Sequence, residues 1–182
     1  MRCLFLFCFF SLYLCSLECP GITEPYVSVT PSKLADQCLN KTPQTQINVL
    51  LDFYDSLNGQ NWIIQDNWLN MSVSVCSWTG IICDSECNIT QIFMTANNLK
   101  GLLPQLVDLP ALTVISLLCN HIKGGIAQFS NMTQLSFINM DGNEINEELP
   151  ELSKLVNLTL LKKKKNRITG TIDDSILPNS VY

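Results

Sequence analysis

The sequence predicts an α/β solenoid, a right-handed superhelix with short parallel strands on its concave face and a helical N-terminal cap. Three observations support this fold class. A motif recurs every 23 residues in the second half of the chain, an amphipathic helical pattern precedes the repeats, and a cysteine-flanked motif joins the two. One coil of this size cannot bury its apolar face alone, so such repeats are stable only when they stack on one another.

The first residues have the pattern of a secretory signal. A positively charged start precedes an apolar stretch over residues 3–17, which is short for a membrane-spanning helix. Residues 1–21 are therefore interpreted as a signal peptide cleaved between Ser16 and Gly21, followed by a linker over residues 22–42. The alternative is an uncleaved signal anchor that attaches the chain to a membrane. No second apolar segment of this kind follows, so we expect a secreted, extracellular chain without a later transmembrane segment.

Composition narrows the classes of partner and sets the expected state of the cysteines. The net charge of −5 argues against a nucleic-acid partner, because phosphate binding needs a basic face. Oxidising conditions outside the cell favour disulfides. Five of the nine cysteines lie well beyond the signal, so at least one of them is expected to be unpaired or paired between chains. These five are Cys38, Cys76, Cys83, Cys87 and Cys119.

Residues 43–88 are expected to form the cap. Thr42 is a plausible helix N-cap, Pro43 suits the first helical position, and Gly59 is a terminator. Apolar side chains recur between them at helical spacing and give the helix one apolar face. They are Ile47, Leu50, Leu51, Tyr54 and Leu57. A helix of this kind before a solenoid is expected to cover the apolar end of the first coil.

Residues 89–182 contain four units with the frame L-x-x-L-x-L-x-x-N-x-L, the signature of leucine-rich repeats. The units begin at Ile89, Leu112, Leu135 and Leu158. In each unit the first, fourth and sixth residues should point inward from a short parallel strand. An asparagine follows at one phase, where its amide can satisfy backbone groups and stack as a ladder. The ladder residues are Asn97, Asn120, Asn143 and Asn166.

The fourth unit is degenerate. Lys163 stands where an apolar inward residue is expected, and the chain stops at Tyr182, where a fifth unit would begin. Because the end of a solenoid normally needs a capping element, we expect a truncated array or a fragment of a longer one.

The motifs together resemble a known family. The sequence from Leu50 to Gly101, with Cys-x-Trp-x-Gly-x-x-Cys ahead of the first repeat, resembles the plant-type leucine-rich-repeat N-terminal domain and its repeats. This arrangement occurs in receptor-like kinase ectodomains and is similar to that of polygalacturonase-inhibiting proteins. The resemblance implies a disulfide between Cys76 and Cys83, with Trp78 packed between the cap helix and the first coil. Two departures are units one residue shorter than usual and the extra cysteines Cys38 and Cys87, candidates for a second bridge.

Catalytic and metal chemistry have little support. Cys83 and Cys87 have loose zinc-ligand spacing, but the single histidine, His121, lies on a distant coil, so neither metal nor cofactor is expected. Cys119 and His121 flank Asn120 in an ordinary coil, which leaves Cys119 as an expected leftover thiol. There is no triad, phosphate loop or spaced carboxylate pair, so we do not expect an enzyme.

The concave strand face is the expected recognition surface. Equal positions of successive parallel strands stack side by side about 4.8 Å apart, so outward residues should form continuous columns. The candidate ligand-binding residues are Phe93, Val114, Ser116, Phe137, Asn139 and Leu160. The apolar ones can form an anchoring stripe, or can be apolar simply because they are half-covered.

The sequence as a whole therefore predicts a secreted or cell-surface recognition module that binds a protein, peptide or glycan through its concave face. The alternative is a truncated fragment of a larger leucine-rich-repeat receptor or receptor kinase with no independent activity.

A basic run occupies residues 162–167. Lys164 shares its repeat phase with Asp141, and Arg167 shares its phase with Glu144, so the run is expected to complement the acidic third coil. Exposed pairs of this kind contribute only ~0–1 kcal/mol each.

Five N-x-Ser/Thr sequons follow the signal, and the first, at Asn40, is weakened by Pro43. The predicted N-glycosylation sites are Asn70, Asn88, Asn131 and Asn157.

Overall fold

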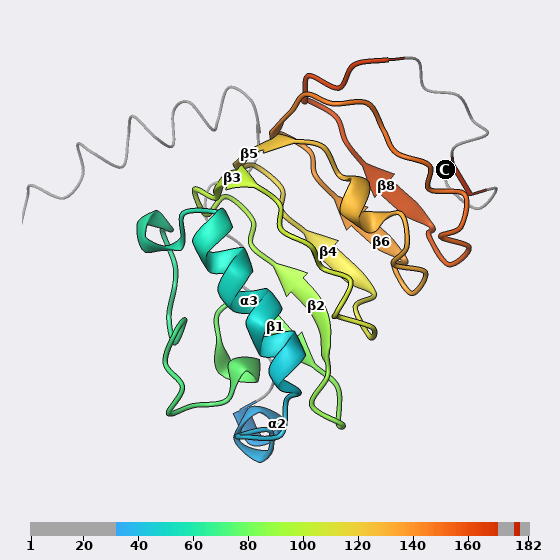
Figure 1. Ribbon diagram of the computed structural model, residues 1–182. Helices are drawn as coiled ribbons and strands as arrows, with labels where there is room; N and C mark the ends of the chain where they lie inside the picture. The colour runs from blue at the N-terminus through green and yellow to red at the C-terminus, as the bar shows by residue number, and fades with distance from the viewer. Residues whose placement is uncertain (1–31, 171–176, 179–182) are drawn as a thin grey trace, which may run out of the picture.

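The computed structural model describes residues 32–170 and 177–178. They form a stack of coils with the helix α3 (Gln44–Ser56) at one end and the strand β8 (Leu160–Lys162) at the other (Figure 1). The predicted signal peptide and part of the fourth repeat lie outside the described residues. Within the described ranges, no helix combines the length and the apolar character needed to cross a membrane.

The cap is larger than the sequence indicated. It contains the expected helix α3, the short 3-10 helices η1 (Gly59–Asn61) and η2 (Val75–Ser77), and the strand β1 (Ile81–Cys83). It also contains a helix that was not predicted, α2 (Ser32–Gln37), which packs against η2. The last part of the predicted linker is therefore folded onto the cap.

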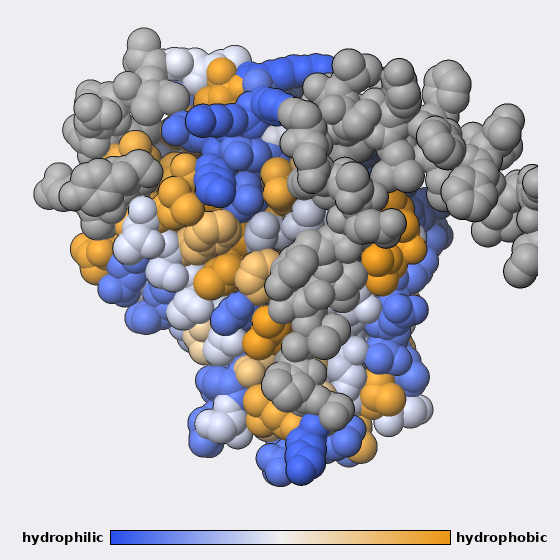
Figure 2. Space-filling view, turned by 180° about the vertical axis from the view of Figure 1, so that it is seen from behind, coloured by the Kyte–Doolittle hydropathy of each residue, from blue (hydrophilic) through white to orange (hydrophobic). Residues whose placement is uncertain are grey.

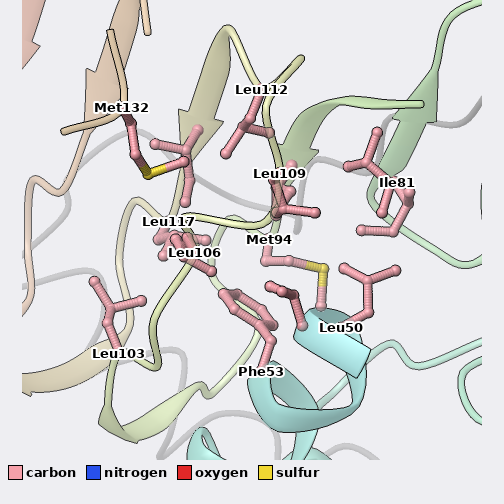
Figure 3. Close-up of a cluster of buried hydrophobic side chains, with 14 of the residues drawn as sticks. Leu50, Phe53, Ile81, Met94, Leu103, Leu106, Leu109, Leu112, Leu117 and Met132 are labelled. Atoms are coloured by element: carbon pink, nitrogen blue, oxygen red, sulfur yellow. The ribbon is translucent and has the colours of Figure 1, made fainter. Parts of the chain in front are cut away.

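The helix α3 begins at Gln44 with Pro43 as its N-cap, one residue later than the predicted start with Thr42 as the cap, and it covers the end of the first coil. Leu50 and Phe53 are fully buried, and Figure 3 shows them pointing toward the core that Met94 of the first coil also enters. The buried face also includes a polar residue that periodicity could not find. Gln46 is 3% exposed because its Oε1 accepts a hydrogen bond from the backbone N of Ile89 at 2.9 Å.

One sheet of five strands runs along the repeats in the order β1-β2-β4-β6-β8. Strand β1 is antiparallel to β2 (Ile89–Phe93). The strands β4 (Val114–Ser116), β6 (Phe137–Asn139) and β8 then follow in parallel. Val114 pairs with Phe137, and Phe137 with Leu160, which is the 23-residue register that the repeat predicts. The predicted solenoid is confirmed.

A second, three-stranded parallel sheet was not predicted. It contains β3 (Lys100–Leu102), β5 (His121–Gly124) and β7 (Glu144–Ile145). Its first strand also bonds to the cap, because the backbone N of Lys100 donates to the Leu57 carbonyl at 3.0 Å. Gly101 has φ +143°, and a Cβ there would lie 2.0 Å from the Ser56 carbonyl oxygen. Only glycine allows the chain to pass this close to the end of α3.

A single hydrophobic core extends from the cap into the fourth coil. The inward residues of the parallel strands are fully or almost fully buried; they are Ile92, Ile115, Ile138 and Leu161. Burial of a side chain of this size stabilises the fold by about 1.5–3 kcal/mol. Lys163, which stands at an inward position of the fourth coil, is only half-buried.

The asparagines satisfy the backbone where each coil leaves the first sheet. The Asn120 Nδ2 donates to the carbonyls of Met94 and Leu117 at 2.7 and 2.9 Å. Its Oδ1 accepts from the backbone N atoms of Asn97 and Leu99, both at 3.0 Å. Asn143 and Asn166 make the same kinds of contact one and two coils further on.

The first of these asparagines bonds to the cap instead of to a preceding coil. The Asn97 Nδ2 donates to the Ile64 carbonyl at 2.8 Å, and its Oδ1 accepts from the Ile64 backbone N. The cap loop therefore takes the place of a preceding coil, and the ladder continues into the cap.

We expect Asn120→Ala to lower the free energy of unfolding by about 3–5 kcal/mol, because each buried backbone group left without a partner costs about 1–3 kcal/mol. Chemical denaturation measures the change. The matched control is Asn146→Ala, at an exposed position that makes one such bond, from the backbone N of Gly124 at 3.0 Å. Equal losses in the two variants would contradict the structural role of the ladder.

Candidate functional site

Two disulfides hold the cap. Cys76 and Cys83 are bonded, with their Cα atoms 5.7 Å apart, and this bridge joins η2 to the end of β1. Cys38 and Cys87 are bonded as well, with Cα atoms 5.3 Å apart, and this bridge joins the segment after α2 to the turn before β2. These two bridges are here called the clasp. They include the pair Cys38 and Cys87, which the sequence offered only as a candidate.

Cys119 is also disulfide-bonded, so the expectation of a leftover thiol is wrong. It lies just after β4, is 6% exposed and has φ +58°. A bonded sulfur is no nucleophile, and the neighbouring His121 turns its Nδ1 toward Glu144 Oε1 at 3.1 Å. The proximity of cysteine and histidine in the sequence therefore creates no catalytic pair.

Tryptophans fill the space between the cap helix and the clasp. Trp78 is fully buried, and its ring centroid lies 5.0 Å from that of Trp68. Trp68 in turn stacks on Phe53 of α3 at 6.3 Å, and Trp62 meets it edge-on at 4.8 Å. Sequence periodicity does not indicate a role for Trp68, although its ring connects Trp78 to the helix. The Nε1 atoms of Trp62 and Trp68 donate to backbone carbonyls, whereas that of Trp78 is buried without a hydrogen-bond partner among the described residues.

Gly80, the glycine of the Cys-x-Trp-x-Gly-x-x-Cys motif, allows β1 to pair with β2. Gly80 has φ +82°, and a Cβ there would lie 2.3 Å from the Phe93 carbonyl oxygen and 2.6 Å from the Met94 sulfur. The backbone N of Phe93 donates to the Gly80 carbonyl at 2.8 Å. The clasp motif thus positions the first strand of the concave sheet.

The predicted ligand-binding residues lie together on one face of the five-stranded sheet, in two columns. One column runs Gln91, Val114, Phe137, Leu160, and the other runs Phe93, Ser116, Asn139, Lys162. The register therefore separates Phe93 from the other three apolar residues of the expected stripe. The apolar column is made of Val114, Phe137 and Leu160, all half-buried.

The two polar candidates are less accessible than the sequence suggested. Ser116 and Asn139 are each 6% exposed. The Asn139 Oδ1 is already engaged, because it accepts from the backbone N of Asp141 at 3.1 Å. The apolar column, not these polar residues, is therefore the more accessible part of the candidate site.

The most exposed large hydrophobic side chains lie away from this column. On the face seen in Figure 2, the described residues show hydrophobic patches bordered by hydrophilic ones. Sequence periodicity gave no indication of this exposure. The residues concerned are Leu39, Ile63, Leu69, Met71, Leu102, Val107 and Val156.

The acidic side chains of the third coil do not form the predicted ion pairs with Lys164 and Arg167. Glu144 contacts two side chains of the preceding coil, His121 at 3.1 Å and Lys123 at 3.6 Å, rather than Arg167. Burial raises the pKa of Glu144, but the hydrogen bond from His121 and the charge of Lys123 outweigh it and lower the pKa below its usual value. Asp141 accepts from the backbone N of Lys164 and not from its ammonium group.

The predicted glycosylation sites differ in accessibility. Asn70, Asn131 and Asn157 are exposed. Asn88 is half-buried where the cap meets β2, and its Oδ1 accepts from Gln46 Nε2 at 3.0 Å while its Nδ2 donates to Asp84 at 3.3 Å.

Among the residues that the structure describes, no three His, Cys, Asp or Glu side chains are grouped so that they could hold a metal ion.

Residues 43–84, which contain α3 and the Cys76–Cys83 bridge, match the leucine rich repeat N-terminal domain family. Over these residues the chain is similar to the N-terminal domains that precede leucine-rich repeats. The chain is also 35% identical over 73 residues to the LRR receptor kinase SERK2 of Oryza sativa subsp. japonica. The match covers 40% of the chain and only 12% of that kinase.

Solved structures show the same fold. The ectodomain of the Arabidopsis receptor kinase HAESA, in complex with an IDA peptide hormone ligand, is 25% identical, with a TM-score of 0.60. The match covers 76% of this chain and 23% of the HAESA chain. PEPR1 in its structure with AtPEP1 is 22% identical, with a TM-score of 0.61, over 74% of this chain and 20% of that one.

We expect Gly80→Ala to lower the free energy of unfolding by about 2–4 kcal/mol, because a side chain at positive φ is strained and its Cβ overlaps the backbone of β2. Tryptophan fluorescence during denaturation measures the change, since all three tryptophans lie in the cap. The control is Gly125→Ala, whose Cβ would have side-chain atoms of Glu147 as its nearest neighbours, first the carboxylate Oε2 at 2.4 Å. A loss no larger than that of the control would refute the role of Gly80.

Proposed function

We propose that this chain is an extracellular recognition module that binds its ligand on the concave sheet. The ligand classes are those that the sequence predicts, a protein, peptide or glycan, and an extended peptide fits the face best. The observation that carries the proposal is the apolar column of Val114, Phe137 and Leu160, which the strand register holds side by side. Half-buried apolar side chains in a row provide the anchoring contacts on which binding energy concentrates.

The geometry favours an extended peptide. Neighbouring strands lie about 4.8 Å apart, and an extended chain rises about 3.3 Å per residue. Side chains on one face of such a peptide recur about every 6.6 Å, so a peptide lying across β4, β6 and β8 can place two apolar side chains over the column. The peptide hormone held by the HAESA ectodomain supports a peptide ligand by analogy of fold.

The location outside the cell rests on chemistry as well as on likeness. Disulfides persist in oxidising compartments, and the cap contains two of them. We propose that residues 1–21 direct the chain to the secretory pathway, by cleavage or as an uncleaved anchor. The folded module then consists of the cap over residues 43–88, extended by α2, and the repeats that begin at Ile89.

A second candidate is that these residues act as the N-terminal part of a larger receptor. The SERK2 match supports it, because the matched segment is 12% of a receptor kinase. In that case recognition still takes place on the concave sheet, and signalling belongs to other parts of the protein.

We expect Phe137→Ala combined with Leu160→Ala to abolish most peptide binding, because both changes remove the centre of the apolar column. The probe is a random peptide library displayed on phage and selected on the wild-type chain. Selected peptides should lose at least about tenfold in affinity for the double variant, which corresponds to about 1.4 kcal/mol. Val107→Ala with Val156→Ala, at hydrophobic positions outside the sheet, is the control. Peptides that bind all three proteins equally would show that the concave face is not the site.

We also expect N-glycans at Asn70, Asn131 and Asn157 but not at Asn88. A glycan on the Asn88 Nδ2 would disturb the contacts with Asp84 and Gln46 that join the cap to β2. Gln substitution at each exposed asparagine should raise the gel mobility of the secreted protein, and Asn131→Gln should do so without changing the thermal midpoint. Asn88→Gln should leave the mobility unchanged and lower the midpoint. A glycan found on Asn88 by peptide mapping would contradict this assignment.

A further inference from the structure

We propose that the ligand of the concave face is an acidic peptide whose carboxylates lie over the fourth coil. This inference rests on the proposed function and specifies the chemistry of its ligand. It starts from a cluster of cations, here called the fourth-coil basic cluster, that forms no ion pair within the part of the chain that the structure describes. The cluster consists of Lys162, Lys163, Lys164, Lys165 and Arg167.

The cluster is exceptional for this protein. The chain has a net charge of −5 and only 11 lysines and arginines, yet five of them fall within this one segment. Lys162, Lys164, Lys165 and Arg167 are exposed. Side chains of like charge this close together repel one another, and they attract anions to the same place.

The carboxylates nearest in the repeat are engaged elsewhere. Glu144 contacts His121 and Lys123 through its two oxygens, both on the side of the second coil. Asp141 Oδ1 accepts from the backbone N of Lys164, and the Lys164 ammonium group forms no ion pair with a described residue. In the described part of the chain, both ion pairs involve Glu144 and neither reaches the cluster.

The cluster borders the apolar column. Lys162 is in register with Asn139 on the neighbouring strand, and Leu160 is in register with Phe137. Leu161, between them, is 8% exposed and points into the core. Alternation along a strand therefore places Leu160 and Lys162 on the same outer face, about 6.6 Å apart along β8.

The outer face of the sheet therefore has an apolar part next to a cationic part. Val114 and Phe137 supply uncharged, apolar contacts over the second and third coils, and the lysines follow at the fourth. A peptide with apolar residues in one part and Asp or Glu in the other matches both ends. Electrostatic complementarity of this kind gives specificity and fast association more than raw affinity.

The test compares two charge reversals of equal size. Lys162→Glu with Lys164→Glu removes the cluster's charge beside the column. Lys33→Glu with Lys41→Glu changes the net charge equally at exposed positions of the cap. All four side chains are exposed, so both variants are expected to fold, and the thermal midpoint of each checks this.

The probe is the same phage-displayed peptide library, selected separately on wild type and on each variant. Wild type and the cap variant should select peptides enriched in Asp and Glu, whereas the fourth-coil variant should lose this enrichment or select Lys and Arg. A synthetic acidic peptide from the wild-type selection should bind the fourth-coil variant at least about tenfold more weakly and the cap variant within about twofold. Its wild-type affinity should also fall as salt is added.

Three outcomes overturn the proposal, and they separate it from the proposed function. Peptides that require Phe137 and Leu160 but show no acidic preference would leave the concave site intact and refute the acidic ligand. Peptides that bind independently of Phe137 and Leu160 would refute the proposed function itself. Binding of an acidic oligosaccharide through Lys162 and Lys164, with no peptide selected, would also overturn it in favour of a glycan ligand.

Discussion

The whole stack depends on how buried asparagines satisfy the backbone between the two sheets. Each coil turns sharply after its first strand, and the turn leaves carbonyl and N–H groups inside the protein. One side-chain amide forms hydrogen bonds with several of these groups at once, as Asn120 does with the backbone of Met94, Asn97 and Leu99. Because its bonds reach both its own coil and the preceding one, the coils cannot separate without exposing unpaired groups.

The cap extends this constraint to its own loops. Asn97 finds in Ile64 the partner that a preceding coil would provide, and Gln46 bonds to the backbone N at the start of β2. Polar contacts thus fix the register of the first strand, while the disulfides and Gly80 fix how closely β1 approaches it. The positions of the concave columns follow from this junction, since every later strand is placed by the one before it.

The sequence was sufficient for features that repeat and insufficient for features that do not. Equal phase predicted the register of Val114, Phe137 and Leu160, because identical coils stack identically. The helix α2, the burial of Gln46 and the role of Trp68 each depend on a single contact, so no period signals them. The pairing of Cys38 with Cys87 could be offered but not decided, because it depends on how α2 packs.

The same limit applies to the charged side chains. The sequence predicts that the basic run pairs with the acidic third coil, whereas Glu144 contacts His121 and Lys123 of the second coil. Equal phase places Glu144 between His121 of the second coil and Arg167 of the fourth, but phase alone cannot say which one it contacts. The second sheet decides, because its register sets Lys123 opposite Glu144 and so draws the carboxylate toward the second coil. Among the described residues, Glu144 therefore pairs toward the cap, and no ion pair involves the cations of the fourth coil beside the apolar column. The face consequently has an apolar part and a cationic part, and the ligand that we propose for it matches both.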